Sequence, residues 1–161
     1  MIKSGKDNFM SDKEFLEKAI AKAKESVSQG GFPAGAIVVK NDEIVGEGIS
    51  IGNKLNDPTS HGEMASIRAA CQNLKTTDLS GCVLYASMQP CLMCLGASMW
   101  SSIPKIVFAC RKEQVSDEYY GGHYAPSAIN SEFIRPIELS HLALLESASL
   151  SLVHEWENKM K

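Results

Sequence analysis

The sequence predicts an α/β fold, a three-layer α/β/α sandwich in which helices cover both faces of a mixed five-stranded sheet. Short runs rich in β-branched residues alternate along the chain with longer runs whose apolar residues recur at helical spacing. Their order is helix, hairpin, helix, strand, helix, strand, loop, strand and helix, an order typical of a sheet enclosed between helices. A length of 161 residues corresponds to one domain, which we place at residues 11–161 after a flexible lead-in at residues 1–10.

The first helix and the hairpin have clear start and stop signals. Ser11 with Glu14 forms a capping box, apolar residues at helical spacing follow, and Gly30-Gly31 end the run. Residues 35–40 and 43–49 read as two strands joined by Asn41-Asp42, residues that accept left-handed backbone geometry at low cost. Residues 52–59 read as a loop.

The middle of the chain alternates helices with buried strands. Helices are expected at residues 62–74 and from Pro90 or Cys91 to Trp100, and strands at residues 82–86 and 105–110. Residues 112–132 show no regular pattern. A fifth strand is expected at residues 134–139 and a last helix at residues 142–156.

Composition limits the classes of protein. Hydrophobic residues make up 44% and charged residues 22%, the net charge is −3 and the pI is about 5.8, so no basic field attracts nucleic acid. The chain has five cysteines, and its sequence shows neither a secretion signal nor an apolar run of membrane-spanning length. These features predict a cytoplasmic protein whose cysteines are reduced.

One histidine, one glutamate and a cysteine pair form the candidate chemical site. Cys91 and Cys94 are three residues apart at a helix start, where the helix dipole favours the thiolates that bind metal. With His61 they make three zinc ligands and leave the fourth position open, which is typical of catalytic rather than structural zinc. Glu63 lies two residues beyond His61 and is the candidate general acid and base.

The pair of motifs His61-x-Glu63 and Pro90-Cys91-x-x-Cys94 resembles the cytidine/deoxycytidylate deaminase superfamily. The resemblance extends from about residue 31 to residue 109. It implies one zinc ion per chain, a zinc-bound hydroxide that attacks the amino-bearing carbon of a base, and release of ammonia. It also implies the mixed five-stranded sheet, a homodimer, and a small nucleobase or nucleoside as substrate rather than nucleic acid.

Three branches of this superfamily compete. The segment with His61, Gly62 and Glu63 resembles fungal-type cytosine deaminases, whereas the acidic and aromatic segment before the last helix resembles bacterial guanine deaminases. A tRNA adenosine deaminase is the alternative, disfavoured by the acidic pI and by residues 110–117, which lack that branch's usual segment. A second alternative is a non-catalytic, zinc-stabilised binding domain.

Five residues are expected to contact the substrate. Relatives commonly have an asparagine that touches the base or sugar where this chain has Ser50, and Asn53 lies nearby. Residues 117–124 read either as a solvated loop or as a lid that stacks on the base, and Phe32 reads either as a pocket wall or as a core residue. The expected contacts are Phe32, Ser50, Gly62, Asp117 and Tyr119.

The remaining cysteines and histidines are expected to have no chemical role. Cys71, Cys82 and Cys110 lie in apolar runs and are predicted to be core residues. The other histidines lack any motif and are predicted at the surface or at helix ends: His123, His141 and His154.

Overall fold

The computed structural model describes residues 10–161. Residues 1–9 of the expected lead-in lie outside that range, and Met10 packs against the core beside the first helix. No helix in the described part of the chain combines the length and apolar character needed to cross a bilayer.

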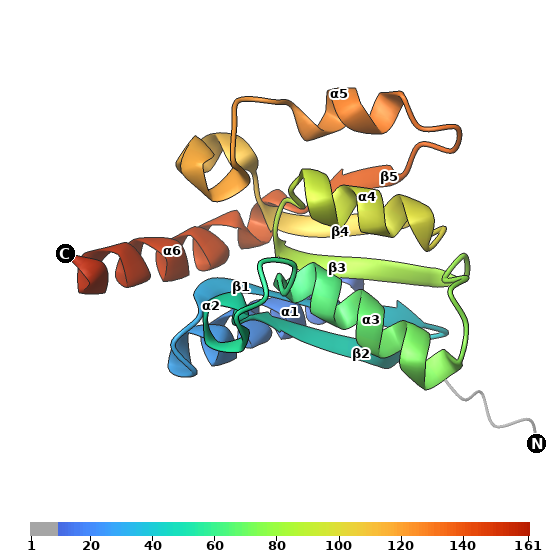
Figure 1. The fold of residues 1–161 in the computed structure, drawn as a ribbon, viewed down its shortest axis with the longest axis horizontal. Helices are drawn as coiled ribbons and strands as arrows, with labels where there is room; N and C mark the ends of the chain where they lie inside the picture. The colour runs from blue at the N-terminus through green and yellow to red at the C-terminus, as the bar shows by residue number, and fades with distance from the viewer. Residues whose placement is uncertain (1–9) are drawn as a thin grey trace, which may run out of the picture.

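A five-stranded mixed sheet forms the middle layer (Figure 1), which confirms the predicted fold class. The strand order is β2-β1-β3-β4-β5, with antiparallel pairing of β1 to both β2 and β3, and parallel pairing from β3 through β4 to β5. The strands are β1 Phe32–Lys40, β2 Glu43–Ser50, β3 Cys82–Met88, β4 Lys105–Cys110 and β5 Glu138–His141.

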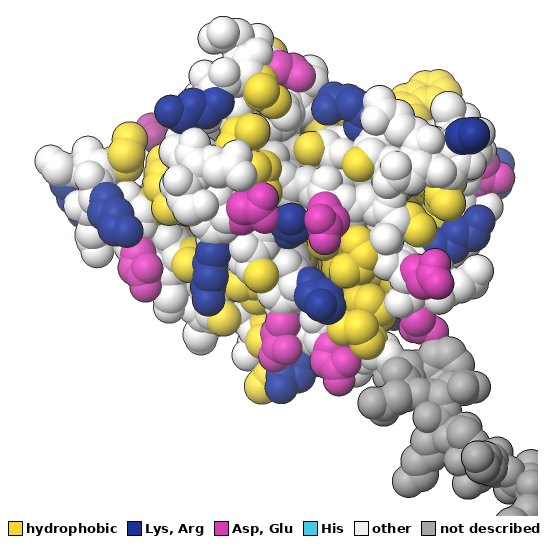
Figure 2. All heavy atoms as spheres, turned by 90° about the horizontal axis from the view of Figure 1, so that it is seen from below, with side chains coloured by type: hydrophobic (Ala, Val, Ile, Leu, Met, Phe, Trp, Pro, Cys, Tyr) yellow, Lys and Arg dark blue, Asp and Glu magenta, His cyan; other side chains and the backbone are white. Residues whose placement is uncertain are grey.

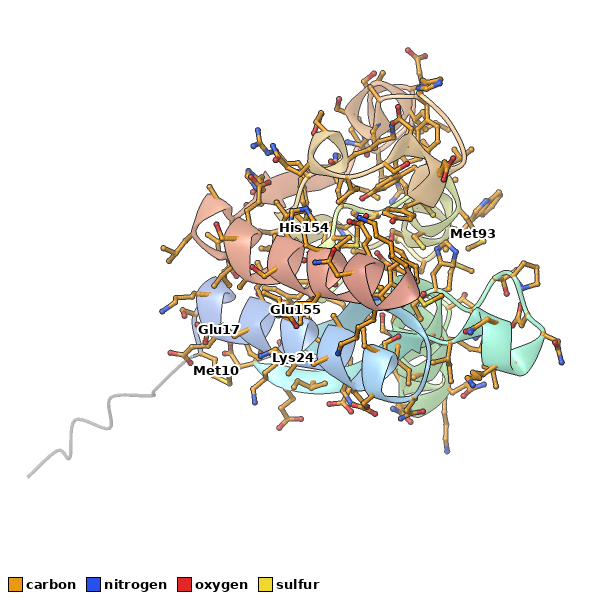
Figure 3. The ribbon with its side chains drawn as sticks, turned by 90° about the vertical axis from the view of Figure 1, so that its left-hand side faces the viewer. Met10, Glu17, Lys24, Met93, His154 and Glu155 are labelled. Carbon is orange, nitrogen blue, oxygen red and sulfur yellow. The ribbon has the colours of Figure 1, made fainter. Side chains whose placement is uncertain are left out.

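Helices cover both faces of this sheet. The helices α3 (Gly62–Leu74) and α4 (Leu92–Trp100) pack on one face, and α1 (Asp12–Ser28) and α6 (Glu146–Met160) pack on the other. Alternate residues of β1 face opposite layers, because strand side chains alternate. Val38 contributes to the core under α3 and α4, while Ile37 and Val39 contribute to the core under α1. Figure 3 shows α1 and α6 lying side by side.

Close backbone contact holds α3 against the hairpin. A Cβ atom on Gly48 would lie 2.0 Å from the carbonyl oxygen of Gly62, and one on Gly62 would lie 2.9 Å from the Cα atom of Gly35. Side chains at these positions would force α3 away from the sheet. The glycines therefore set the position of the N-terminus of α3, where His61 and Glu63 lie.

Most predicted elements form with small shifts at their ends. Ser11 caps α1 by accepting a hydrogen bond of 3.3 Å from the Glu14 N–H, and Asn41 and Asp42 have φ angles of 49° and 61° in the hairpin turn. Cys82 and Cys110 are buried and Cys71 is half-buried against the core, as expected for residues without a chemical role.

Four expectations about the bounds of elements or the content of loops were wrong. The fifth strand is Glu138–His141 rather than residues 134–139, because Ile134 is fully exposed and only the later residues pair with β4. The last helix begins at Glu146 rather than at residue 142, after a 3₁₀ turn. Residues 112–132 contain two 3₁₀ turns, η1 (Lys112–Gln114) and η2 (Asp117–Tyr120), and α5 (Pro126–Ser131), and the expected loop at 52–59 contains α2 (Gly52–Leu55).

Candidate active site

A cavity of about 190 Å³ lies where β1 begins, β3 ends and the N-termini of α3 and α4 converge. Each helix presents the free N–H groups and the positive end of its dipole toward this region. The lining side chains come from five segments that are distant in sequence: Phe32, Ala34, Ser50, His61, Glu63, Met88, Gln89, Cys91, Tyr119 and Tyr120.

The tertiary structure brings His61, Cys91 and Cys94 together. The Nδ1 atom of His61 is 3.6 Å from each cysteine sulfur, and the two sulfurs are 3.6 Å apart. A tetrahedral zinc ion with bonds of about 2.0–2.3 Å separates its donor atoms by about 3.4–3.8 Å. The three donors therefore fit one zinc ion without rearrangement.

The cysteines occupy the first turn of α4 as predicted. Cys91 is the N-cap residue of α4, and Cys94 lies three residues later on the same face. The pKa of the Cys91 thiol is lowered to about 4, first by its hydrogen bond with Cys94 and then by its contact with His61, although burial opposes the shift. The hydrogen bond with Cys91, and then burial, raise the pKa of Cys94 well above its usual value. Cys91 is thus ready to bind a cation as a thiolate, and metal binding would release the proton of Cys94.

Glu63 is buried beside this donor set. Its side chain lies in the first turn of α3 and is 5% exposed, and its Oε2 accepts a contact of 3.6 Å from the Cys94 sulfur. Burial raises the pKa of Glu63 to about 7, and the negative charge of Cys91 adds to that effect. A carboxyl group with such a pKa can both accept and return a proton at neutral pH.

Three of the five expected substrate contacts line the cavity, namely Phe32, Ser50 and Tyr119. Gly62 faces β1, where its lack of a side chain permits close packing. Asp117 lines a separate hollow and contacts Lys112 and His123. Asn53 donates a hydrogen bond of 3.0 Å to the Gly30 carbonyl and lines a neighbouring hollow of about 360 Å³.

Trp156 of α6 completes an aromatic wall that the sequence did not reveal. The Phe32 ring lies 5.0 Å from that of Tyr119 and 5.2 Å from that of Trp156, both in edge-to-face geometry. Tyr119 is fixed by a hydrogen bond of 2.6 Å from its hydroxyl to Glu157. Sequence reasoning also missed Ala34, Met88 and Gln89 as lining residues, although Met88 and Gln89 directly precede the Pro90-Cys91 motif. Tyr120 lies within residues 117–124, which were read as a loop or a lid.

A three-donor metal position beside a buried carboxylate, at helix N-termini over an α/β/α sandwich, defines a metal-dependent hydrolytic site. Residues 10–110 match the family model described as the cytidine and deoxycytidylate deaminase zinc-binding region. The chain belongs to this family, and it is a zinc-dependent hydrolytic deaminase of nucleobase or nucleoside amino groups. The predicted family and reaction class are confirmed.

Relatives from two branches resemble the chain. The guanine deaminase of Bacillus subtilis is 36% identical over 153 residues, which cover 92% of this chain and 96% of that protein. The tRNA-specific adenosine deaminase of Aquifex aeolicus is 39% identical over 113 residues, which cover 70% of this chain and 72% of that protein. The solved guanine deaminase from Nitrosomonas europaea shares the fold with a TM-score of 0.79 at 22% identity, over 92% of this chain and 85% of that one.

Proposed function

We propose that the protein is a guanine deaminase that acts on the free base. The observation that carries the proposal is the similarity to the Bacillus subtilis guanine deaminase, which extends over 92% of this chain. The family model ends at residue 110, whereas Tyr119, Tyr120 and Trp156 at or beside the cavity follow it. Similarity that includes this last third of the chain bears directly on the residues that would select the base.

One zinc ion per chain would be held by His61, Cys91 and Cys94. When bound, zinc would act as a Lewis acid and lower the pKa of a water molecule to about 7. Glu63 would take a proton from the attacking water and deliver it to a ring nitrogen of the base. It would then take the proton of the newly added hydroxyl group and give it to the departing amine, so that the carbonyl forms as ammonia leaves. One buried carboxyl group can perform these steps in sequence because its pKa of about 7 permits both protonation states.

The cavity suits a single heterocycle. Its volume of about 190 Å³ is bounded by Phe32 and Tyr119, whose ring faces and edges can pack against a flat base. Ser50 offers a hydroxyl group to a polar edge of that base, and its position is set by hydrogen bonds between its backbone and the hydroxyl of Ser26. Selectivity would follow because a wrong base leaves a buried polar group unpaired.

The alternative function is deamination of adenosine in tRNA, because the Aquifex aeolicus relative is a tRNA-specific adenosine deaminase. A tRNA-binding surface requires a basic field that contacts phosphates. The net charge is −3, and on the face over β2 and its flanking helices Lys and Arg alternate with Asp and Glu (Figure 2). The charge distribution therefore favours a small uncharged substrate.

Ammonia release from a panel of substrates tests the proposal. The panel contains guanine, cytosine, adenine, the corresponding nucleosides and tRNA, each incubated with zinc-loaded protein. We expect guanine to have the highest kcat/KM, with guanosine far lower. Preference for cytosine, or deamination of tRNA that weakens steeply with salt, would contradict the assignment. If zinc-loaded protein deaminates none of these substrates, the non-catalytic binding domain is favoured.

We further propose that the protein forms a homodimer through α4. Leu92, Gly96 and Trp100 recur every fourth residue and so lie on one face of this helix. Leu92 is 52% exposed and Trp100 is 82% exposed, and a Cβ atom on Gly96 would meet no atom within 4 Å. Exposed apolar stripes mark interaction surfaces, and a second copy of the chain would cover this one.

A further inference from the structure

Lys112 places a positive charge inside the protein. Its side chain is 7% exposed, and its ammonium bonds to the Asp117 carboxylate. The ammonium also lies 5.4 Å from the ring centroid of Tyr120 and 5.5 Å from that of Tyr124. A buried ammonium is costly unless it is paired, and aromatic faces attract cations. The charge therefore gathers three side chains of the segment at residues 117–124 around one point.

Both tyrosines reach from that point to the backbone beside the metal ligands. The Tyr120 hydroxyl donates a hydrogen bond of 2.8 Å to the Gln89 carbonyl, and the Tyr124 hydroxyl accepts one of 2.8 Å from the Leu92 N–H. Gln89 lies two residues before Cys91, and Leu92 directly follows Cys91. The backbone N–H of Lys112 itself bonds to the Gln89 side-chain oxygen at 2.9 Å.

We propose that Lys112 is a positioning residue for the metal site. Its ammonium holds Tyr120 and Tyr124 in place, and through their hydroxyl groups it fixes the backbone on both sides of Cys91. This inference rests on the zinc-binding role proposed for His61, Cys91 and Cys94, and on no particular substrate. Groups that orient a metal ligand without touching the metal are commonly worth a factor of about 10–100 in metal affinity or activity.

Asp117 is the carboxylate that pairs with the buried ammonium of Lys112. It bonds to Lys112 with one carboxylate oxygen and to the exposed His123 with the other, at 2.6 Å. It is 43% exposed, so water can solvate it when Lys112 is replaced. Replacing the lysine therefore removes the buried charge without leaving another buried charge unpaired, which makes Lys112→Met a clean substitution.

Zinc affinity measured without substrate tests the proposal. Zinc alone is the probe, and a chelator of known affinity competes for it with the wild type, Lys112→Met, Tyr124→Phe and the double variant. We expect Lys112→Met to raise the zinc dissociation constant about 10–100-fold and Tyr124→Phe to raise it several-fold. The matched control is Lys24→Met, which makes the same change on the exposed face of α1 (Figure 3) and should leave the constant unaltered.

The double variant tests whether Lys112 affects zinc binding through Tyr124. If Lys112 acts through Tyr124, the two effects on zinc affinity are less than additive; full additivity would overturn that route. A Lys112→Met protein that melts earlier but binds zinc as the wild type does would show a purely structural role and overturn the proposal. If Lys112→Met does not fold, Tyr124→Phe serves as the test instead. Unchanged zinc affinity in Tyr124→Phe would then overturn the proposal. Failure to deaminate guanine affects none of these readouts.

Discussion

The side chains of Phe32 and Trp156 meet edge to face with ring centroids 5.2 Å apart. Phe32 is the first residue of β1 and lines the cavity, and Trp156 lies in the last helix of the chain. This contact links the start of β1 to the C-terminal helix beside the proposed base-binding site. Trp156 itself lines the neighbouring hollow, so the C-terminal helix supports the cavity wall through Phe32.

Replacing Trp156 by Ala is expected to weaken substrate binding. Phe32 and Tyr119 both lose an aromatic contact, and such pairs are worth about 0.5–1.5 kcal/mol each. We expect KM for guanine to rise about 10-fold while kcat changes less, because the metal donors and Glu63 are untouched. Steady-state kinetics measures both constants. The variant Trp156→Phe keeps an aromatic ring and should recover most of the loss; equal losses in the two variants would contradict an aromatic role.

Glu63→Gln is expected to abolish turnover and retain zinc. The amide cannot exchange protons, so kcat should fall by a factor of about 10²–10⁴. Because Glu63 is not among the three donors, zinc content measured by atomic emission should equal that of the wild type. Glu43→Gln, at an exposed position beside the hairpin turn, serves as the control. Ammonia release by Glu63→Gln at the normal rate would refute the proton-transfer role.

Removal of zinc should inactivate the protein reversibly. Dialysis against a chelator is expected to abolish ammonia release, and one equivalent of zinc per chain should restore it. Since the thiols must lose their protons to bind, zinc affinity should fall as the pH falls. Cys91→Ser should lose zinc, whereas Cys71→Ser, on the opposite end of α3 from the site, should keep it. Restoration of activity that needs two equivalents of zinc would contradict a single site.

Glu146 should stabilise the fold in a pH-dependent way. The hydrogen bond from the Arg111 guanidinium is the main cause that lowers the pKa of Glu146 to about 2, against about 4.3 in an unfolded chain. The contribution of Glu146 to the free energy of unfolding is therefore complete above about pH 4.5 and is lost as the pH falls toward 2. We expect Glu146→Gln to lower the free energy of unfolding by about 1–2 kcal/mol at pH 7.

The difference between Glu146→Gln and the wild type should shrink between pH 4.5 and pH 2. Denaturant unfolding at several pH values measures it. Glu155→Gln, on the outer face of the same helix (Figure 3), is the matched control and should have little effect. A difference that stayed constant down to pH 2 would exclude the charge of Glu146 as the cause.

Trp100→Glu should convert the proposed dimer into a monomer. A charge on the apolar face of α4 would have to be buried between two copies, at a high cost in free energy. Light scattering after size-exclusion chromatography gives the mass directly. Ile134→Glu introduces the same charge at a fully exposed position outside α4 and should leave the dimer intact. A wild type that is monomeric, or a dimeric Trp100→Glu, would rule out this interface.

The regular elements were predictable because their signals are local. The cap at Ser11, the turn at Asn41-Asp42 and the continuous apolar run of β1 depend on neighbours within a few positions. The fifth strand was misplaced because its register depends on pairing with β4, which no local pattern encodes. The metal donors could be found for a different reason: His61, Cys91 and Cys94 have few chemical uses at that spacing.

The chemistry of this protein can be read from its amino-acid sequence alone: three donors for zinc, a carboxylate beside them and the sheet that carries both. What surrounds that chemistry depends on the tertiary structure, because the packing of α6 on the sheet brings Trp156 and Glu157 to Phe32 and Tyr119. The tertiary structure also brings the Tyr120 and Tyr124 hydroxyl groups to the backbone of Gln89 and Leu92. Side chains separated by many residues meet through packing of the whole core, and that packing is a global property which no short segment contains.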